Sequence, residues 1–136
     1  MIVADVNLIA YLLLGGPDKR LAQRVLELEP VWAAPRLWRS EFRSVLAAYM
    51  RQRDLSVSDA WRAHELAEQL LEGHEFDVSG QRVLTLVASS ACSAYDCEYV
   101  ALAEELAVQL VTADRQLLRA FADRAISPKE FVDSAA

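Results

Sequence analysis

Short apolar segments alternate with longer amphipathic segments along this chain of 136 residues. Residues 2–4, 31–33 and 108–112 are apolar runs of the length of buried strands. Residues 37–53 and 94–107 carry apolar side chains every three or four positions, the spacing of a helix that buries one face. Short buried strands separated by helices are typical of an α/β domain with a mostly parallel sheet. The remaining expected elements are helices over 7–14, 17–29, 56–73, 80–90 and 114–121, brief strands at 76–78 and 125–126, and a helical turn from residue 128.

The composition is that of an ordinary globular protein, with 54% hydrophobic and 25% charged residues. A chain of this length can bury a single core, so we expect one domain spanning residues 1–136. No apolar run approaches the ~20 residues of a membrane span, and the N-terminal sequence lacks the basic start of a signal peptide. Cys92 and Cys97 have neither redox-motif nor zinc-site spacing. These features predict a cytoplasmic protein with reduced thiols and no membrane contact.

Two aspartates follow strands of the predicted sheet. Asp5 ends the run at residues 2–4, and Asp114 comes shortly after residues 110–111. Ligands of parallel α/β sheets bind beyond the carboxyl ends of the strands, so both carboxylates lie at the usual ligand edge. Each aspartate also precedes a predicted helix and could instead serve as its N-cap, a role that Asn7 could share with Asp5.

Two further acids lie on helices, where the apolar pattern does not predict exposed charge. At about 100° per residue, Asp96 projects inside the apolar stripe of helix 94–107, and its place in the first turn favours an anion. Helix capping is the alternative for Asp96. Glu41 projects roughly 80° from the centre of the stripe on helix 37–53. Its alternative is a rim position, paired with a neighbouring helix.

Together, the four acids favour a metal site. Burying carboxylates side by side costs on the order of several kcal/mol each unless a cation pairs with them. A hard divalent ion with oxygen ligands is the simplest such cation. The histidines have no Cys or Asp at ligand spacing, so we expect His64 and His74 to be solvated. The tryptophans are expected in the core rather than as base-stacking platforms, and they are Trp32, Trp38 and Trp61.

The charge balance narrows the function classes without excluding nucleic acid. A net charge of −6 argues against a phosphate-binding surface. However, five arginines fall between Arg36 and Arg53, and four of the negative charges belong to the candidate site, where two divalent ions would cancel them. The only lysines are Lys19 and Lys129, and neither is placed for a haloacid-dehalogenase-type phosphatase or a response-regulator receiver, both of which need a lysine.

The acids recur with characteristic neighbours in a fixed order. Asp5 is followed by Asn7, Glu41 lies within Ser-Glu-Phe, residues 93–97 read Ser-Ala-Tyr-Asp-Cys, and residues 110–114 read Leu-Val-Thr-Ala-Asp. This ordered set, which covers nearly the whole chain, resembles the PIN-domain ribonuclease family, most closely the VapC-type toxins of VapBC toxin–antitoxin pairs. Many relatives have Thr or Ser where Asn7 stands, and Asn is a tolerated polar substitute.

The resemblance implies a PIN-like α/β/α sandwich with a short, mostly parallel central sheet flanked by helices. It also implies a Mg²⁺- or Mn²⁺-dependent endoribonuclease that leaves a 5′-phosphate and a 3′-hydroxyl. Asp5 and Asp96 would be the principal metal ligands, and Glu41 and Asp114 would complete the acidic pocket.

Further roles follow from the same resemblance. Asn7 and Thr112 would orient ligands or water through hydrogen bonds. An RNA substrate, a cognate antitoxin that fills the acidic groove, often with an arginine, and a homodimer are implied as partners. The alternative is a PIN-like module that binds RNA or a partner with little or no nuclease activity. Phosphate contacts would come from arginines outside the pocket, for which solvated surface or internal ion pairs are the alternative: Arg36, Arg51, Arg53 and Arg115.

Overall fold

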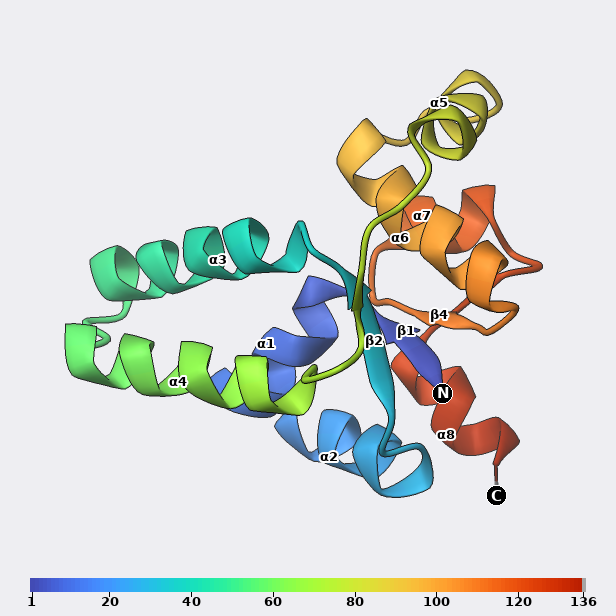
Figure 1. Cartoon of the computed structure of the whole chain (residues 1–136). Coiled ribbons are helices and arrows are strands. Elements are labelled where there is room, and N and C mark those ends of the chain that lie inside the picture. Colours follow the sequence, from blue (N-terminus) through green and yellow to red (C-terminus); the bar gives the residue numbers. More distant parts are fainter. Residues whose placement is uncertain (136) are drawn as a thin grey trace.

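A computed structural model describes residues 1–135 of the chain. Its centre is a parallel five-stranded sheet with the strand order β3-β2-β1-β4-β5 (Figure 1). The expected mostly parallel sheet is therefore confirmed. Strand β3 begins one residue earlier than predicted, since it follows the register with β2. The strands are β1 (Ile2–Ala4), β2 (Trp32–Pro35), β3 (Glu75–Phe76), β4 (Leu110–Val111) and β5 (Ala125–Ile126).

Helices cover both faces of this sheet. Helix α6 packs against β1, β2 and β4, while α1 packs against α2, α3 and α4. In Figure 1 the pair α3 and α4 extends away from the sheet as a helical hairpin. The helices are α1 (Val6–Leu14), α2 (Lys19–Leu28), α3 (Trp38–Gln52), α4 (Val57–Leu70), α5 (Gly80–Ala88), α6 (Ala94–Leu106), α7 (Arg115–Ala120) and α8 (Pro128–Ser134).

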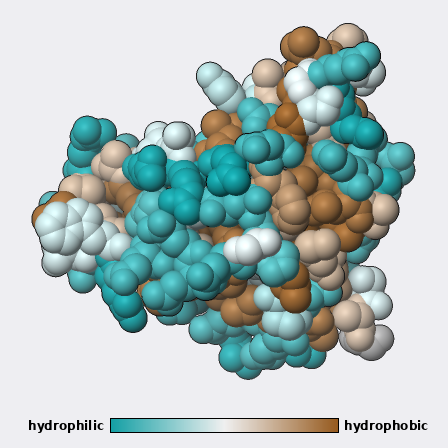
Figure 2. Space-filling model, viewed as in Figure 1, coloured by the Kyte–Doolittle hydropathy of each residue, from teal (hydrophilic) through white to brown (hydrophobic). Residues whose placement is uncertain are grey.

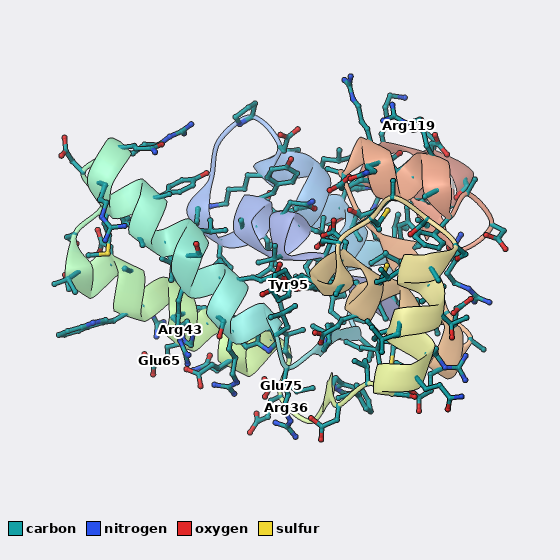
Figure 3. All side chains as sticks on the ribbon, turned by 90° about the horizontal axis from the view of Figure 1, so that it is seen from above. Arg36, Arg43, Glu65, Glu75, Tyr95 and Arg119 are labelled. Atoms are coloured by element: carbon teal, nitrogen blue, oxygen red, sulfur yellow. The ribbon has the colours of Figure 1, made fainter. Side chains whose placement is uncertain are left out.

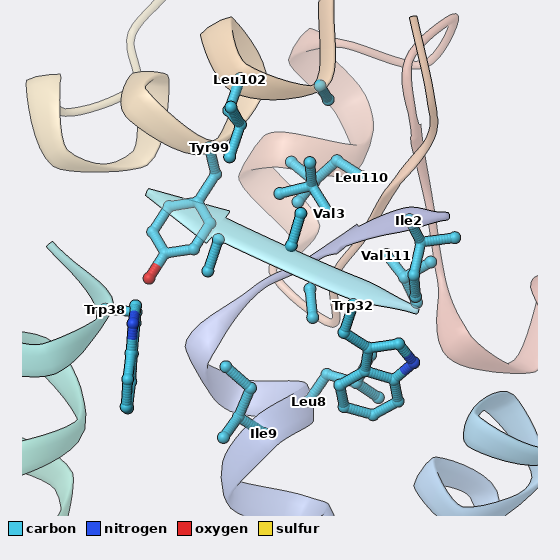
Figure 4. Packing of buried hydrophobic residues seen from close by; sticks show 14 of the residues in the cluster. Ile2, Val3, Leu8, Ile9, Trp32, Trp38, Tyr99, Leu102, Leu110 and Val111 are labelled. Carbon is cyan, nitrogen blue, oxygen red and sulfur yellow. The ribbon is translucent and has the colours of Figure 1, made fainter. Parts of the chain in front are cut away.

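The core lies between the two helical layers. In Figure 4 the strand side chains, such as Val3 and Leu110, have Tyr99 and Leu102 of α6 on one side and Ile9 of α1 on the other. These side chains are fully buried or nearly so. Strands covered on both faces require apolar residues throughout, which explains the continuous apolar runs in the sequence. The predicted three-layer α/β/α sandwich is confirmed.

Two predictions about helix α4 were wrong. Trp61 is 68% exposed rather than in the core. His64 is partly buried, with its ring stacked on Trp38 at 5.6 Å between centroids. The reason is that α4 packs on α1 and α3 through small residues, Ala60 and Ala63 among them, so the large apolar residue beside them faces outward.

The surface combines polar helices with a few exposed apolar residues. Figure 2 shows mainly hydrophilic residues over α3 and α4, and hydrophobic residues that reach the surface towards α5. Leu84 of α5 is 66% exposed. Cys92 and Cys97 carry free thiols and are both buried. Within residues 1–135, no helix is both long enough and apolar enough to span a membrane.

Candidate active site

Asp5 lies at the carboxyl end of β1 and caps α1. Its Oδ1 accepts a hydrogen bond from the Val6 N–H at 2.8 Å, and its Oδ2 accepts one from the Thr112 hydroxyl at 2.5 Å. Because β1 and β4 are adjacent and parallel, with Ala4 opposite Val111, the residues that follow them meet at one edge. The cap role and the sheet-edge position that the sequence offered as alternatives are therefore both real.

Burial dominates the electrostatics of Asp5. The side chain is 5% exposed, and desolvation raises its pKa to about 6, against the opposing hydrogen bonds from Thr112 and Val6. The charges of Asp96 and Asp114 make a smaller contribution to this rise. The hydrogen bonds to this carboxylate thus do not offset the cost of burying its charge, and a nearby cation would favour the ionised form.

Asn7 and Thr112 connect Asp5 to the loop after β4. Asn7 donates from Nδ2 to Asp5 Oδ2 at 3.2 Å, and its Oδ1 accepts from the Ala113 N–H at 3.3 Å. The fully buried Thr112 hydroxyl also accepts from the Asp114 N–H at 3.0 Å. Both side chains therefore fix the position of Asp5 relative to the loop, while their role in orienting ligands or water at a metal stays a prediction.

Glu41 reaches the site from the first turn of α3. Its Oε1 accepts a 2.6 Å hydrogen bond from the hydroxyl of Tyr99 on α6. Burial raises the pKa of Glu41, the Tyr99 hydrogen bond opposes this, and the charges of Asp5 and Asp96 add to it. The contact with a neighbouring helix that was the alternative for Glu41 exists, but its partner is a hydroxyl rather than a cation.

Asp96 occupies the first turn of α6 and is partly buried. The cap of this helix is Ser93, whose Oγ accepts from the Asp96 N–H at 3.0 Å, so the capping alternative for Asp96 is wrong. Burial raises the pKa of Asp96, and the charge of Asp114 raises it further. Asp96 thus brings a charge to the site that helix capping does not require.

Asp114 is the N-cap of α7. Its Oδ1 accepts from the backbone N–H groups of Gln116 at 2.8 Å and Leu117 at 3.2 Å. The capping alternative is therefore correct, and the same carboxylate acts electrostatically on Asp5 and Asp96. One oxygen caps the helix, which leaves the other free for a further partner.

The donor chemistry of the four acids fits a hard divalent cation. No acid among them forms an ion pair with any side chain of residues 1–135. As the side chains stand, no three His, Cys, Asp or Glu groups of those residues converge closely enough to hold a metal ion. Mg²⁺ does not require such a cage, because it usually keeps several waters and binds through one or two carboxylates.

Two of the predicted RNA-binding arginines follow the carboxyl ends of β2 and β4 in the chain. Arg36 follows β2 at the same sheet edge, but its Nε donates to Asp77 Oδ1 at 3.0 Å. Arg115 directly follows Asp114 as the first residue of α7 and is exposed. Neither arginine forms an ion pair with an acid of the site within residues 1–135.

The other two predicted arginines lie at the far end of α3. Arg51 is ten residues beyond Glu41, about 15 Å along the helix axis. The guanidinium of Arg53 lies over the Tyr49 ring, 5.0 Å from its centroid. Their RNA-binding role stays a prediction, and they would act on substrate remote from the acids.

Two tyrosines complete the site and were missed from the sequence. Tyr99 lies in the apolar stripe of α6, so its pattern is that of any core aromatic. Tyr95, one turn earlier, is 62% exposed and borders a hollow of about 400 Å³ beside Glu41. A separate hollow of about 490 Å³ between α3 and α4 contains none of the four acids and includes His64 and Trp61.

The sequence profile of the PIN domain matches residues 2–123. The chain belongs to the PIN-domain family. The match spans all four acids, from β1 to the loop after β4. No curated protein is similar enough to the chain to be matched.

Solved structures share the PIN fold at low sequence identity. A toxin–antitoxin complex from Klebsiella pneumoniae is 18% identical with a TM-score of 0.68, over 94% of this chain and 98% of that one. PAE2754 from Pyrobaculum aerophilum is 19% identical with a TM-score of 0.72, over 98% and 94%. FitAcB from Neisseria gonorrhoeae is 19% identical with a TM-score of 0.73, over 95% and 99%. At these identities the likeness establishes the fold.

Proposed function

We propose that this PIN-domain protein is a Mg²⁺- or Mn²⁺-dependent endoribonuclease and the toxin of a toxin–antitoxin pair. One observation carries the proposal. Asp5, Glu41 and Asp96 come from three different parts of the fold. The charge of Asp96 raises the pKa of both Asp5 and Glu41, and the charge of Asp114 raises that of Asp96. None of the three has a cationic partner within residues 1–135. A fold rarely gathers uncompensated carboxylates at its ligand edge unless they serve a site.

The four acids have different roles in this proposal. Asp5 and Asp96 would hold the ion, with Glu41 and Asp114 completing the pocket. The ion would make the attacking water more acidic and neutralise the charge that develops on the scissile phosphate. Thr112 holds Asp5 for this role, and a tyrosine hydroxyl holds Glu41. Such fixed neighbours keep the ligand set in place as the reaction proceeds.

The test is cleavage of single-stranded RNA by the purified chain. We expect cleavage with Mg²⁺ or Mn²⁺, none in EDTA, and 3′-hydroxyl ends on the products. Asp96→Asn should abolish cleavage, whereas Glu105→Gln, on the exposed side of the same helix, should retain it. Cleavage that persists in EDTA, or full activity of Asp96→Asn, would overturn the proposal.

A second candidate is a PIN-like module that binds RNA or a partner without cutting. The observation in its favour is that no three possible ligands converge among the described residues. The same experiment separates the two functions, because a binding module retains RNA affinity without producing cut ends. We favour the nuclease, since a purely binding role gives no reason to concentrate repelling acids at the sheet edge.

The partners are also part of the proposal. Two of the fold neighbours come from structures described as a toxin–antitoxin complex and as FitAB bound to a DNA fragment. With the sequence resemblance, this supports a cognate antitoxin. A homodimer is proposed from the sequence resemblance alone, and action in the cytoplasm from the sequence features. Co-expression with the protein encoded beside this gene should give a complex that no longer cleaves RNA, and the chain alone should sediment as a dimer.

A further inference from the structure

The N-terminal turn of α6 presents an exposed aromatic ring beside the acids. Tyr95 and Tyr99 are one turn apart and share a side of the helix. Tyr99 is fully buried and contacts Glu41, whereas Tyr95 is 62% exposed. The same side of α6 therefore carries the buried tyrosine that contacts Glu41 and, one turn earlier, an exposed tyrosine ring.

Tyr95 forms one wall of a hollow whose other wall is α3. This hollow of about 400 Å³ is lined by Leu37, Ser40, Glu41 and Ser44 together with Tyr95. Figure 3 shows Tyr95 between the helices α3 and α6. The lining thus combines one aromatic face, one apolar side chain and two hydroxyls, with a carboxylate of the proposed active site at its border.

This chemistry suits a flat, uncharged ligand with polar edges. An aromatic face stacks on a planar ring, and serine hydroxyls both donate and accept hydrogen bonds. The carboxylates disfavour a phosphate in the same hollow, because like charges repel. Among residues 1–135, the lining of the hollow includes no arginine or lysine that could attract a phosphate. Stacking and hydrogen bonds, rather than ion pairs, are therefore the contacts that can position a substrate in this hollow.

We propose that Tyr95 is the stacking platform for an unpaired nucleobase next to the cleaved phosphate, a site that rests on the proposed nuclease function. Stacking on an aromatic ring is available to every base, so the site selects single-stranded over paired RNA rather than a particular sequence. A base held in a duplex cannot enter, since its faces are already stacked. The ring accordingly sets which phosphate lies at the acids.

The experiment measures RNA affinity and base stacking in EDTA, where cleavage does not interfere. A single-stranded RNA carrying 2-aminopurine reports stacking by its fluorescence, and anisotropy reports affinity. Tyr95→Ala should weaken binding about 5- to 150-fold, the range for loss of one stacked base, and should abolish the fluorescence change. Tyr95→Phe keeps the ring and should stay within about twofold of the original affinity.

A matched control is Trp61→Ala, which removes a comparably exposed aromatic, 68% exposed, from a different hollow and should leave RNA affinity unchanged. An RNA with one abasic position removes the stacked base without changing the protein. The unmodified protein should bind this RNA as weakly as Tyr95→Ala binds intact RNA, and a folding defect cannot explain that result. Mg²⁺ affinity, measured by calorimetry, should be unaffected by Tyr95→Ala.

Three outcomes would overturn the assignment in distinguishable ways. If the unmodified protein cleaves RNA but Tyr95→Ala binds and cleaves equally well, the stacking site is wrong and the nuclease function stands. If Tyr95→Ala weakens only self-association in sedimentation, the ring belongs to a protein interface instead. If the unmodified protein neither binds nor cleaves RNA, the proposed function fails and the stacking site fails with it.

Discussion

The hydroxyl of Tyr99 donates a 2.6 Å hydrogen bond to Glu41 Oε1 and joins α6 to the first turn of α3. The two residues are 58 positions apart in the chain. Burial raises the pKa of the Tyr99 phenol well above its usual value, as do the neighbouring charges of Glu41 and Asp5, so the phenol stays a hydrogen-bond donor. The contact holds a carboxylate of the proposed site against the sheet edge.

Tyr99→Phe should therefore destabilise the protein and loosen Glu41. A hydrogen bond to a charged group contributes about 1.5–3 kcal/mol, and its loss removes the contact that lowers the pKa of Glu41. We expect a lower free energy of unfolding in urea and a higher pKa of Glu41 by NMR titration. The control is the same substitution in a Glu41→Gln background, where the cost should be smaller. An equal cost in both backgrounds would mean that the hydroxyl acts elsewhere.

The stability of the metal-free protein should carry a pH dependence that originates at Asp5. Its pKa is raised from 3.8 to about 6, so the folded state binds the proton more tightly than the unfolded state. The free energy of unfolding therefore falls as pH rises from about 4 to 6.5, by up to about 3 kcal/mol from this group.

Comparison with Asp5→Asn isolates this contribution, since other carboxyls titrate in both proteins. The difference in unfolding free energy between the two should shift in favour of the variant as pH rises from 4.5 to 7.5. The hydrogen bonds that the substituted amide side chain loses add an offset that does not vary with pH. A difference that stays constant over this range would rule out the raised pKa.

Asp96→Asn should be neutral or stabilising in EDTA, unlike substitutions at Asp5. No side chain within residues 1–135 donates a hydrogen bond to the Asp96 carboxylate, so its removal relieves repulsion without breaking a bond. We expect a gain of roughly 1 kcal/mol or less. A loss of more than that in thermal unfolding would assign Asp96 a structural role.

Divalent metal should raise the melting temperature of the original protein but not of Asp96→Asn. A ligand that binds only the folded state stabilises it by about 2.7 kcal/mol at 100 times its dissociation constant. Titration with Mg²⁺ or Mn²⁺ followed by thermal unfolding measures this directly. Glu105→Gln should respond like the original protein, because its side chain lies on the exposed side of α6. An equal response in Asp96→Asn would place the ion elsewhere.

Thr112→Val should lower the free energy of unfolding, although valine and threonine have nearly the same shape. The buried hydroxyl donates to Asp5 and accepts from the Asp114 N–H. Its loss leaves Asp5 Oδ2 with Asn7 as its remaining side-chain donor and removes the acceptor of the Asp114 N–H, at about 1–3 kcal/mol. The pKa of Asp5 should rise further, since this hydrogen bond lowers it. Thr112→Ser, which keeps the hydroxyl, is the control for both measurements.

Local chemistry explains why much of the fold was predictable. Ser56 and Ser93 cap their helices, and their hydroxyls accept from the N–H groups of Asp59 and Asp96, each three residues further along the chain. The position of Asp5 at the ligand edge followed from the end of an apolar run. These features depend on neighbours a few residues away, so a single sequence contains them.

The wrong predictions concern side chains whose environment depends on which element packs against their helix. Trp61 was expected in the core and His64 in solvent, but α4 packs on α1 and α3, which leaves Trp61 outside and His64 against Trp38. The roles of the four acids as metal ligands stay predictions.

The sequence by itself determined the alternation of strands and helices and the delivery of Asp5 and Asp114 to one sheet edge, because parallel strands align their carboxyl ends. Only the tertiary structure decided that Thr112 holds Asp5, that Tyr99 holds Glu41 and that Tyr95 stays uncovered. These contacts join residues far apart in the chain, and a pattern within one helix shows which face is buried but not which side chain meets it.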